Sequence, residues 1–374
     1  MKFLDLKLIN PIIAALDKMS YDNPTPIQQQ AIPYILEGRD LFGCAQTGTG
    51  KTAAFALPIL QQLYLKPTQK HIRALILAPT RELASQISDS IKSYGNQLQI
   101  SHATIFGGVS QSNQINELKK GIAILVATPG RLIDLINQGY VRLDKLEYFV
   151  LDEADRMLDM GFINDIKKII RKLPSKRQTL FFSATAAPEI MKLATSLLNN
   201  PVHVSVNPVS SASHLVEQYI YYVSKENKRL LLKHILKNNE IDHALVFTRT
   251  KRGADKVAKE LNNSGIKSDA IHGNKSQGAR ERALKGFKNR SIRVLVATDI
   301  ASRGIDVDRL SHVINYEIPE QAETYVHRIG RTGRAGASGI AISLCTDEEI
   351  NYMKDISKLI KQKIAVVSNH PFSK

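Results

Sequence analysis

The chain has 374 residues, 43% of them hydrophobic, and its 51 Lys and Arg side chains outnumber 35 Asp and Glu, for a net charge of +16. This length and composition predict packed cores and two or three domains. Two cysteines exclude a disulfide framework and a Cys-rich metal centre, and the sequence shows neither a signal peptide nor an apolar run long enough to span a bilayer. We therefore expect a cytoplasmic protein that does not contact membranes.

The basic excess is spread over both halves of the chain. Residues 1–206 carry 23 Lys and Arg against 17 Asp and Glu, and residues 207–374 carry 28 against 18. A charge distributed in this way favours a polyanion that is bound across both halves.

The first predicted elements are a helix over residues 3–19 and a rigid turn after it. The turn reads Pro24-Thr25-Pro26-Ile27-Gln28, and its two prolines predict a fixed entry into a second helix. The amide of Gln28 can donate and accept at once, so a fixed Gln28 could read the edge of a base. The alternative for this stretch alone is an ordinary helix start.

A phosphate loop follows the strand predicted at residues 40–44. It reads Ala45-Gln46-Thr47-Gly48-Thr49-Gly50-Lys51-Thr52, and a helix is predicted from residue 53. The glycines let backbone N–H groups point at phosphate oxygens, Lys51 reaches the outer phosphates, and the Thr52 hydroxyl can bind Mg²⁺. The strand–loop–helix context predicts a nucleotide site.

Further strands are predicted at 74–78, around 105, at 124–127, 148–151 and 179–182, and each ends in small polar, basic or acidic residues. Alternation with helices indicates a parallel sheet, so these loops should share one edge, where open α/β sheets bind ligands. After the strand at 148–151 comes Asp152-Glu153-Ala154-Asp155. One carboxylate there can hold Mg²⁺ and another can take a proton from water. The alternative for the acidic pair alone is a solvated strand end.

The second half restarts after a polar, proline-containing stretch at 207–213 that is typical of a flexible linker. Strands are predicted at 244–247, 268–271, 293–297, 313–316 and 340–344, without a second phosphate loop. Arg328, Arg331 and Arg334 recur at three-residue spacing with glycines between them. Opposite a phosphate loop, such arginines favour arginine fingers over a solvated basic helix face.

Together these motifs resemble the DEAD-box RNA helicases of superfamily 2, in the family's order from Phe3 to about Gly339. The stretches 131–134 and 247–250 are most similar to the bacterial RhlE type, while Ser20 and Ser302 stand where the family usually has Gly and Ala. The resemblance implies an α/β fold of two tandem RecA-like domains, each a mostly parallel sheet with helices on both faces. It assigns residues 1–206 to the first domain, 207–213 to the linker, 214–365 to the second domain with the arginine fingers, and 366–374 to a short tail.

The resemblance also implies a role for each motif residue around ATP. In catalysis, Glu153 would deprotonate water, Asp152 and Thr52 would hold Mg²⁺, and Lys51, Arg331 and Arg334 would act on the phosphates. Gln28 would read adenine and Asp306 would contact the ribose. The implied nucleotide-binding set is Phe3, Tyr21, Gln28, Ala45, Gln46, Thr47, Gly48, Thr49, Gly50, Lys51, Thr52, Gly304 and Asp306.

Two further sets are implied. In the coupling set, Ser183 and Thr185 would bond to Asp155, while His327 and Arg328 would tie a closed interface. The RNA-binding set is Pro79, Thr80, Arg81, Gly108, Thr128, Gly130 and Arg131 in the first domain and Thr250, Arg252, Gly273, Gln277 and Thr298 in the second.

The implied activity is RNA-stimulated ATP hydrolysis coupled to domain closure, with local, non-processive separation of short duplexes. The expected cofactors are ATP and Mg²⁺, and the expected partners are single-stranded and short duplex RNA, bound with little sequence preference. We also expect a monomer with ribonucleoprotein or ribosome-assembly partners. Two alternatives stay open, namely a DNA translocase of the same superfamily and an ATP-gated RNA clamp whose unwinding is incidental.

Overall fold

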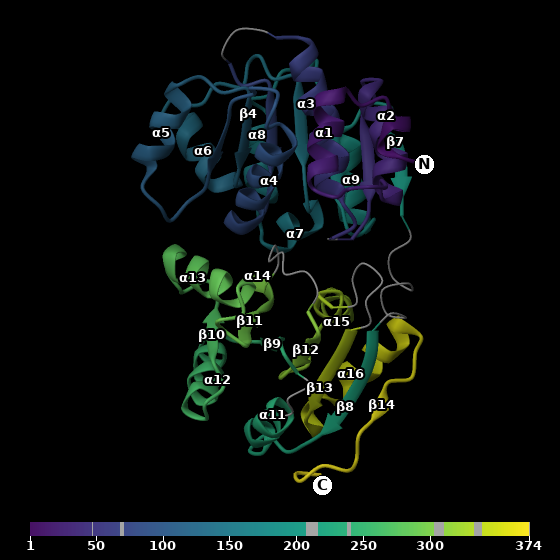
Figure 1. Cartoon of the computed structure of the whole chain (residues 1–374), viewed down its shortest axis with the longest axis vertical. Helices are drawn as coiled ribbons and strands as arrows, with labels where there is room; N and C mark the ends of the chain where they lie inside the picture. Colours follow the sequence, from purple (N-terminus) through teal and green to yellow (C-terminus); the bar gives the residue numbers. More distant parts are fainter. Residues whose placement is uncertain are drawn as a thin grey trace. The chain divides into compact units, whose positions relative to one another are not determined.

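The structure is a computed structural model that describes residues 1–46, 48–67, 71–206, 216–237, 241–302, 310–332 and 339–373. Contacts divide the chain into two compact units, Met1–Val206 and Asn207–Lys374. Each unit is a seven-stranded parallel sheet with helices around it (Figure 1). The stretch predicted as a linker, 207–213, lies outside the described residues.

The sheet of the first unit has the strand order β3-β4-β2-β5-β6-β1-β7. Its strands are β1 (Leu41–Cys44), β2 (Ala74–Leu77), β3 (His102–Ile105), β4 (Ile124–Ala127), β5 (Tyr148–Leu151), β6 (Gln178–Ser183) and β7 (Val202–Ser205). The helical elements are η1 (Phe3–Leu6), α1 (Asn10–Lys18), α2 (Pro26–Leu36), α3 (Lys51–Leu65), α4 (Arg81–Tyr94), α5 (Gln111–Lys119), α6 (Pro129–Asn137), α7 (Ala154–Asp159), α8 (Ile163–Ile170) and α9 (Pro188–Leu197).

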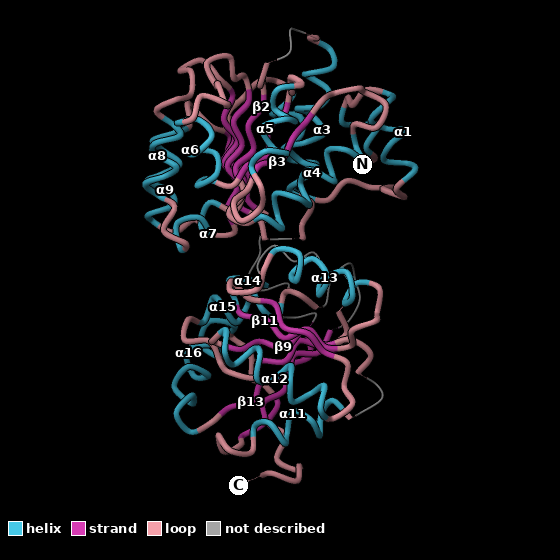
Figure 2. The backbone as a smooth tube through the Cα atoms, turned by 90° about the vertical axis from the view of Figure 1, so that its left-hand side faces the viewer, coloured by secondary structure: helices cyan, strands magenta, loops and turns pink. Residues whose placement is uncertain are grey.

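Alternate residues along each strand supply two separate cores, one on each face of this sheet. Val150 packs with the helices α1 to α4, whereas its neighbour Phe149 packs with α5 to α9. Strands buried on both faces therefore appear as continuous apolar runs, as parallel sheets require. Figure 2 shows the strands lying between helices on either side.

The sheet of the second unit has the order β10-β11-β9-β12-β13-β8-β14, which repeats the first order with each number raised by seven. Its strands are β8 (Val216–Tyr222), β9 (Ala244–Thr248), β10 (Ser268–Ile271), β11 (Val294–Thr298), β12 (His312–Asn315), β13 (Gly339–Cys345) and β14 (Ala365–Val366). The helical elements are α11 (Lys228–Leu236), α12 (Lys251–Asn263), α13 (Gln277–Lys288), α14 (Asp299–Ser302), α15 (Ala322–Ile329), η2 (Asp347–Glu349) and α16 (Ile350–Ile360).

The predicted fold class is confirmed, with two local differences. The helix expected over residues 3–19 is interrupted, because Lys7 adopts a left-handed conformation with φ 57° and a new helix begins at Asn10, with Pro11 in its first turn. The strands β7, β8 and β14 were not predicted. β7 and β14 lie at sheet edges, and all three strands contain exposed residues. Within the described ranges, no helix is long and apolar enough to cross a membrane.

Candidate functional site

The phosphate loop leaves the carboxyl end of β1 and enters α3. Gly48 and Gly50 have positive φ angles of 86° and 93°, which bend the loop as only glycine does without strain. Lys51 is the first residue of α3, and its buried Nζ donates a 2.7 Å hydrogen bond to the Ala45 carbonyl. The ammonium is thus held over the loop, at the positive end of a helix, where an anion is stabilised.

Gln28 joins the proline-bracketed turn to the phosphate loop. Its Nε2 donates to the Gly50 carbonyl at 3.0 Å, and its Oε1 accepts from the Thr25 backbone N–H at 2.9 Å. A Cβ added at Gly50 would lie 2.3 Å from Gln28 Nε2, so a side chain there would displace the Gln28 amide as well as strain the backbone. The Gln28 amide, which is predicted to read adenine, therefore already makes one hydrogen bond through Nε2 and one through Oε1. One N–H and one lone pair are left for a base.

The two aromatic residues of the predicted adenine site are placed differently. Phe3 is 3% exposed and belongs to the core of the first unit, because η1 packs its apolar side inward. Tyr21 is 42% exposed, with its ring centroid 6.4 Å from that of Tyr94. Of the two, Tyr21 is therefore the more accessible to a base.

The acidic motif begins where β5 ends. Asp152 and Glu153 are both buried, and Asp152 Oδ1 accepts a 3.0 Å hydrogen bond from the Glu153 backbone N–H. Burial raises the pKa of the Asp152 carboxyl to about 6, while the charge of Lys51 opposes this shift. The Asp152 carboxylate and the Thr52 hydroxyl at the start of α3 are oxygen donors, and such a set fits Mg²⁺.

Glu153 is oriented by a residue that the sequence analysis did not single out. It caps α7 with a left-handed φ of 53°, and its Oε2 lies 2.6 Å from Nη1 of Arg156. Both side chains of this pair are buried. The spacing of three residues on a helix is a signal that could have indicated Arg156.

The predicted link between β6 and the acidic motif runs through a different atom. Asp155 Oδ2 accepts a 3.1 Å hydrogen bond from the backbone N–H of Ala184, the residue between Ser183 and Thr185. The Thr185 N–H instead donates to Ser183 Oγ at 3.3 Å. The expectation that Ser183 and Thr185 themselves bond to Asp155 is corrected accordingly, since the turn after β6 presents its backbone to the carboxylate.

The RNA-binding set of the first unit lies at the ends of β2, β3 and β4. Thr80 caps α4 by accepting from the Leu83 N–H at 3.3 Å, and Thr128 is the N-cap of α6 directly before Pro129 and Gly130. Pro79, Thr80 and Thr128 are buried, so little of their side chains is open to a ligand.

Arg81 and Arg131 are held in place by neighbours at this edge. A Cβ on Gly108, whose φ is +74°, would lie 2.1 Å from Arg81 Nη1. Arg131 donates to Gln114 Oε1 and to the Val109 carbonyl, both at 3.3 Å. Gln114 and Val109 were not predicted and carry no sequence signal of this role.

In the second unit, the loops after β9, β10 and β11 carry the rest of the RNA-binding set. Thr250 caps α12 by accepting from the Gly253 N–H at 3.0 Å, and Arg252 beside it is exposed. Thr298 ends β11 and is buried. Gln277 is also buried and donates to Glu281 Oε1 at 3.0 Å, which leaves little of the predicted Gln277 contact open to RNA.

The loop of Gly273 is fixed by the residue that precedes it. His272 Nδ1 accepts from the Asn274 N–H at 3.3 Å, and His272 Nε2 lies 3.0 Å from Asp255 Oδ2. Lys275 lies 2.9 Å from the other oxygen of Asp255. A single carboxylate on α12 therefore anchors both ends of this loop.

Arg328 is bound to partners within the second unit. Its side chain is 1% exposed, and its guanidinium binds Asp299 through two hydrogen bonds of 2.6 and 2.8 Å. The same group donates to Asn315 Oδ1 at 3.0 Å and to the Glu317 carbonyl at 2.7 Å. A buried guanidinium needs partners on all sides, and Arg328 has them inside the second unit. The expectation that Arg328 ties a closed interface stays a prediction.

The remaining predicted residues fall into two groups. Arg331 follows α15 and is buried, and His327 lies on α15 with intermediate exposure. Four predicted residues lie outside the described ranges, namely Thr47, Gly304, Asp306 and Arg334.

Comparison with known proteins decides the family. Residues 25–193 match the family described as DEAD/DEAH box helicase, and residues 227–336 match the helicase conserved C-terminal domain. The ATP-dependent RNA helicase CshA of Limosilactobacillus reuteri is 42% identical over 97% of this chain and 73% of its own length. The RNA helicase CrhR of Synechocystis is 44% identical, covering 97% of this chain and 74% of its own. The chain belongs to the DEAD-box family of ATP-dependent RNA helicases.

Solved DEAD-box structures agree with this assignment. Dbp5 of S. cerevisiae bound to RNA and ADP BeF3 matches with a TM-score of 0.88 at 30% identity, covering 98% of this chain and 95% of that one. A DEAD box protein from Methanococcus jannaschii matches at 40% identity with a TM-score of 0.57, covering 98% and 99%. The predicted helicase activity with ATP and RNA is confirmed, whereas the RhlE type gains no support, because these bacterial relatives are named CshA and CrhR.

Proposed function

We propose that this DEAD-box helicase opens short RNA duplexes locally, in a cycle in which Mg²⁺-ATP and RNA together favour a closed state and hydrolysis releases it. The observation that carries the proposal is the buried Asp152 carboxylate, which interacts with the opposite charge of Lys51 at the start of α3. Such a pair is arranged for a nucleotide phosphate and its cation.

The catalytic roles follow from the positions of the side chains. Asp152 and Thr52 would hold Mg²⁺, which when bound neutralises charge on the phosphates. Lys51 binds phosphate oxygens, and Glu153, oriented by Arg156, takes the proton of the attacking water. Arg331, with Arg334 outside the described ranges, stabilises the charge that develops during transfer.

RNA is bound mainly through its backbone. Arg81 and Arg131 of the first unit and Arg252 of the second supply positive charge beside the backbone groups of the capped helix starts. Binding should therefore depend strongly on salt and weakly on sequence. We propose that the chain acts as a monomer in the cytoplasm, on ribonucleoprotein or ribosome-assembly substrates, and that it is of the CshA type.

The test is steady-state ATP hydrolysis with no nucleic acid, with single-stranded RNA and with single-stranded DNA of the same sequence. Strong stimulation by RNA alone supports the proposal. Equal stimulation by DNA would favour the translocase, and hydrolysis without stimulation would remove the coupling to RNA. An RNA clamp is distinguished by slow RNA dissociation in the presence of ATP with little duplex opening.

A further inference from the structure

The two sheets share one strand order, so each element of the first unit has a counterpart in the second. Strand β1 and helix α3 correspond to β8 and α11. Lys51 is the first residue of α3, and Lys228 is the first residue of α11. The second unit therefore keeps a lysine at the counterpart position, although its segment 223–227 contains no glycine.

Lys228 is buried and bound to an internal anion. Its Nζ lies 2.6 Å from Glu349 Oε2 and donates to the Tyr316 carbonyl at 2.8 Å. The ammonium also lies 5.7 Å from the centroid of the Tyr316 ring. Glu349 is 2% exposed, so this is a fully desolvated ion pair, in which removal of one partner leaves the other charge buried and unpaired.

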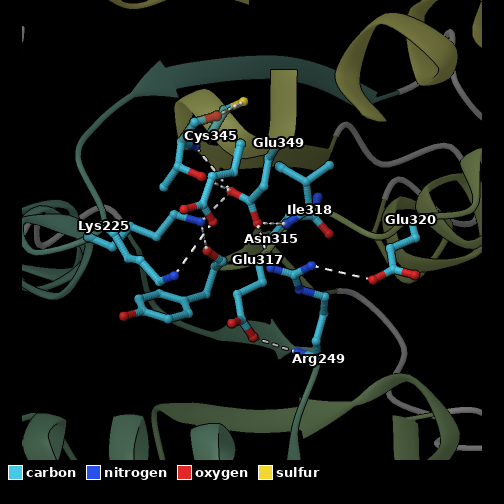
Figure 3. A network of polar contacts seen from close by, with 12 residues as sticks. Lys225, Arg249, Asn315, Glu317, Ile318, Glu320, Cys345 and Glu349 are labelled. Carbon is cyan, nitrogen blue, oxygen red and sulfur yellow. Dashed lines mark hydrogen bonds and ion pairs between the residues drawn. The ribbon is translucent and has the colours of Figure 1, made fainter. Parts of the chain in front are cut away.

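The Glu349 carboxylate is held as a bound anion would be (Figure 3). Its Oε1 accepts from the Ile318 backbone N–H at 3.1 Å, and its Oε2 accepts from the Thr346 N–H at 3.0 Å and the Thr346 hydroxyl at 3.1 Å. Arg249 Nη2 lies 3.4 Å from Oε1. Backbone N–H groups, a hydroxyl, a lysine and an arginine are the donors that phosphate sites use.

We propose that Glu349 is a built-in anion, which in the second unit takes the place that a nucleotide phosphate takes beside Lys51 in the first. This inference rests on the proposed function for the role of Lys51. It identifies Glu349 as a positioning residue: the second unit carries the charge arrangement of a loaded nucleotide site permanently.

Hydrogen bonds link Glu349 to the loop after β9 and to helix α15. Arg249 directly precedes Thr250, and its backbone N–H donates to Glu317 Oε2 at 2.7 Å. The Glu317 carbonyl accepts from Arg328 on α15, and the next residue, Ile318, donates to Glu349. Through the segment 315–318, one carboxylate thus fixes the RNA loop after β9 relative to the arginine-bearing helix α15.

The decisive experiment replaces the anion in the full chain. Glu349→Ala removes Cγ, Cδ and both carboxylate oxygens of the side chain. These two carbons and two oxygens are also the heavy atoms of acetate. Amide hydrogen exchange in α11 and α16 should rise at least about tenfold in this variant, because the Lys228 charge becomes unpaired. Acetate at about 200 mM should return most of this protection, whereas chloride at the same ionic strength should not.

Two control variants make the rescue specific. Lys228→Met combined with Glu349→Ala removes both charges and should show no response to acetate. Glu320→Ala removes an exposed carboxylate that lies 3.5 Å from Arg249, and it should behave as wild type in both salts. Equal effects of acetate and chloride on Glu349→Ala would overturn the inference, as would a response in the double variant.

A kinetic measurement separates positioning from simple stability. With acetate absent, at a temperature where Glu349→Ala stays folded, the half-saturating RNA concentration for ATPase stimulation should rise about tenfold. ATP affinity without RNA should stay within twofold, because the phosphate loop lies in the other unit. Unchanged RNA dependence would overturn the positioning role. Failure of the proposed function would instead appear in the wild-type protein, as ATP hydrolysis that RNA does not stimulate. The effect of acetate on hydrogen exchange in Glu349→Ala could still be measured in that case.

Discussion

Replacing Arg328 by lysine tests whether its guanidinium is a structural centre of the second unit. Arginine makes four hydrogen bonds here, to Asp299, Asn315 and the Glu317 carbonyl, and lies 4.9 Å from the Phe247 ring centroid. A lysine ammonium can keep about two of these bonds and cannot bind Asp299 with two parallel ones. At roughly 1.5 kcal/mol for each lost bond to a charged group, the change should destabilise this unit by about 3 kcal/mol.

Calorimetry of the full chain measures the effect. For a unit of this size, about 3 kcal/mol corresponds to a fall in Tm of roughly 6–12 °C in one of two transitions. The matched control is Arg249→Lys in the same unit, whose side chain is 35% exposed and whose contacts of 3.4 and 3.5 Å are long, so it should lower Tm by less than about 4 °C. Equal effects of the two substitutions would refute the structural role argued for Arg328.

Three further predictions concern the first unit. Because the folded-state pKa of Asp152 is raised to about 6, its contribution to stability is present below about pH 4 and lost as the pH rises through 6. Nucleotide-free Asp152→Asn should therefore be up to about 3 kcal/mol more stable than wild type in urea at pH 8, with the gap closing near pH 4; a gap independent of pH would contradict this. Glu153→Gln should bind ATP and RNA but hydrolyse at least about a hundredfold more slowly in single-turnover assays, and turnover at the wild-type rate would exclude Glu153 as the base. Gly108→Ala should raise the half-saturating RNA concentration about fivefold by displacing Arg81. Gly139→Ala should not, because Gly139 has a similar positive φ but nothing lies within 4 Å of the new Cβ; equal effects would indicate backbone strain alone.

The sequence allowed the nucleotide site to be predicted because its chemistry is local. The phosphate loop and the acidic motif are each a few consecutive residues at the end of a strand, and parallel pairing brings strand ends to one edge. Arg156 was missed although it lies three residues from Glu153 on a short helix, where an ion pair is a common arrangement.

Long-range partners could not be predicted in this way. Lys228 and Glu349 are 121 positions apart, and neither belongs to a motif, so only the folded sheet shows that they meet. Arg328 belongs to a motif, but the interface role that the family resemblance implies for it gives no indication of its partners inside the second unit. The hydrogen-bond partners of Arg328 lie 11 to 29 positions before it in the chain, so they follow from the packing of α15 and not from the spacing of the motif.

The shared strand order also bears on ancestry. Two sheets with the same order of seven strands are the expected products of one duplicated gene segment, after which each copy was free to diverge. One copy has the glycine loop before Lys51, and the other has Lys228 paired with a carboxylate of its own chain. Grafting residues 45–50 in place of 223–227, together with Glu349→Ala, would therefore test whether the second unit can take up a phosphate beside Lys228.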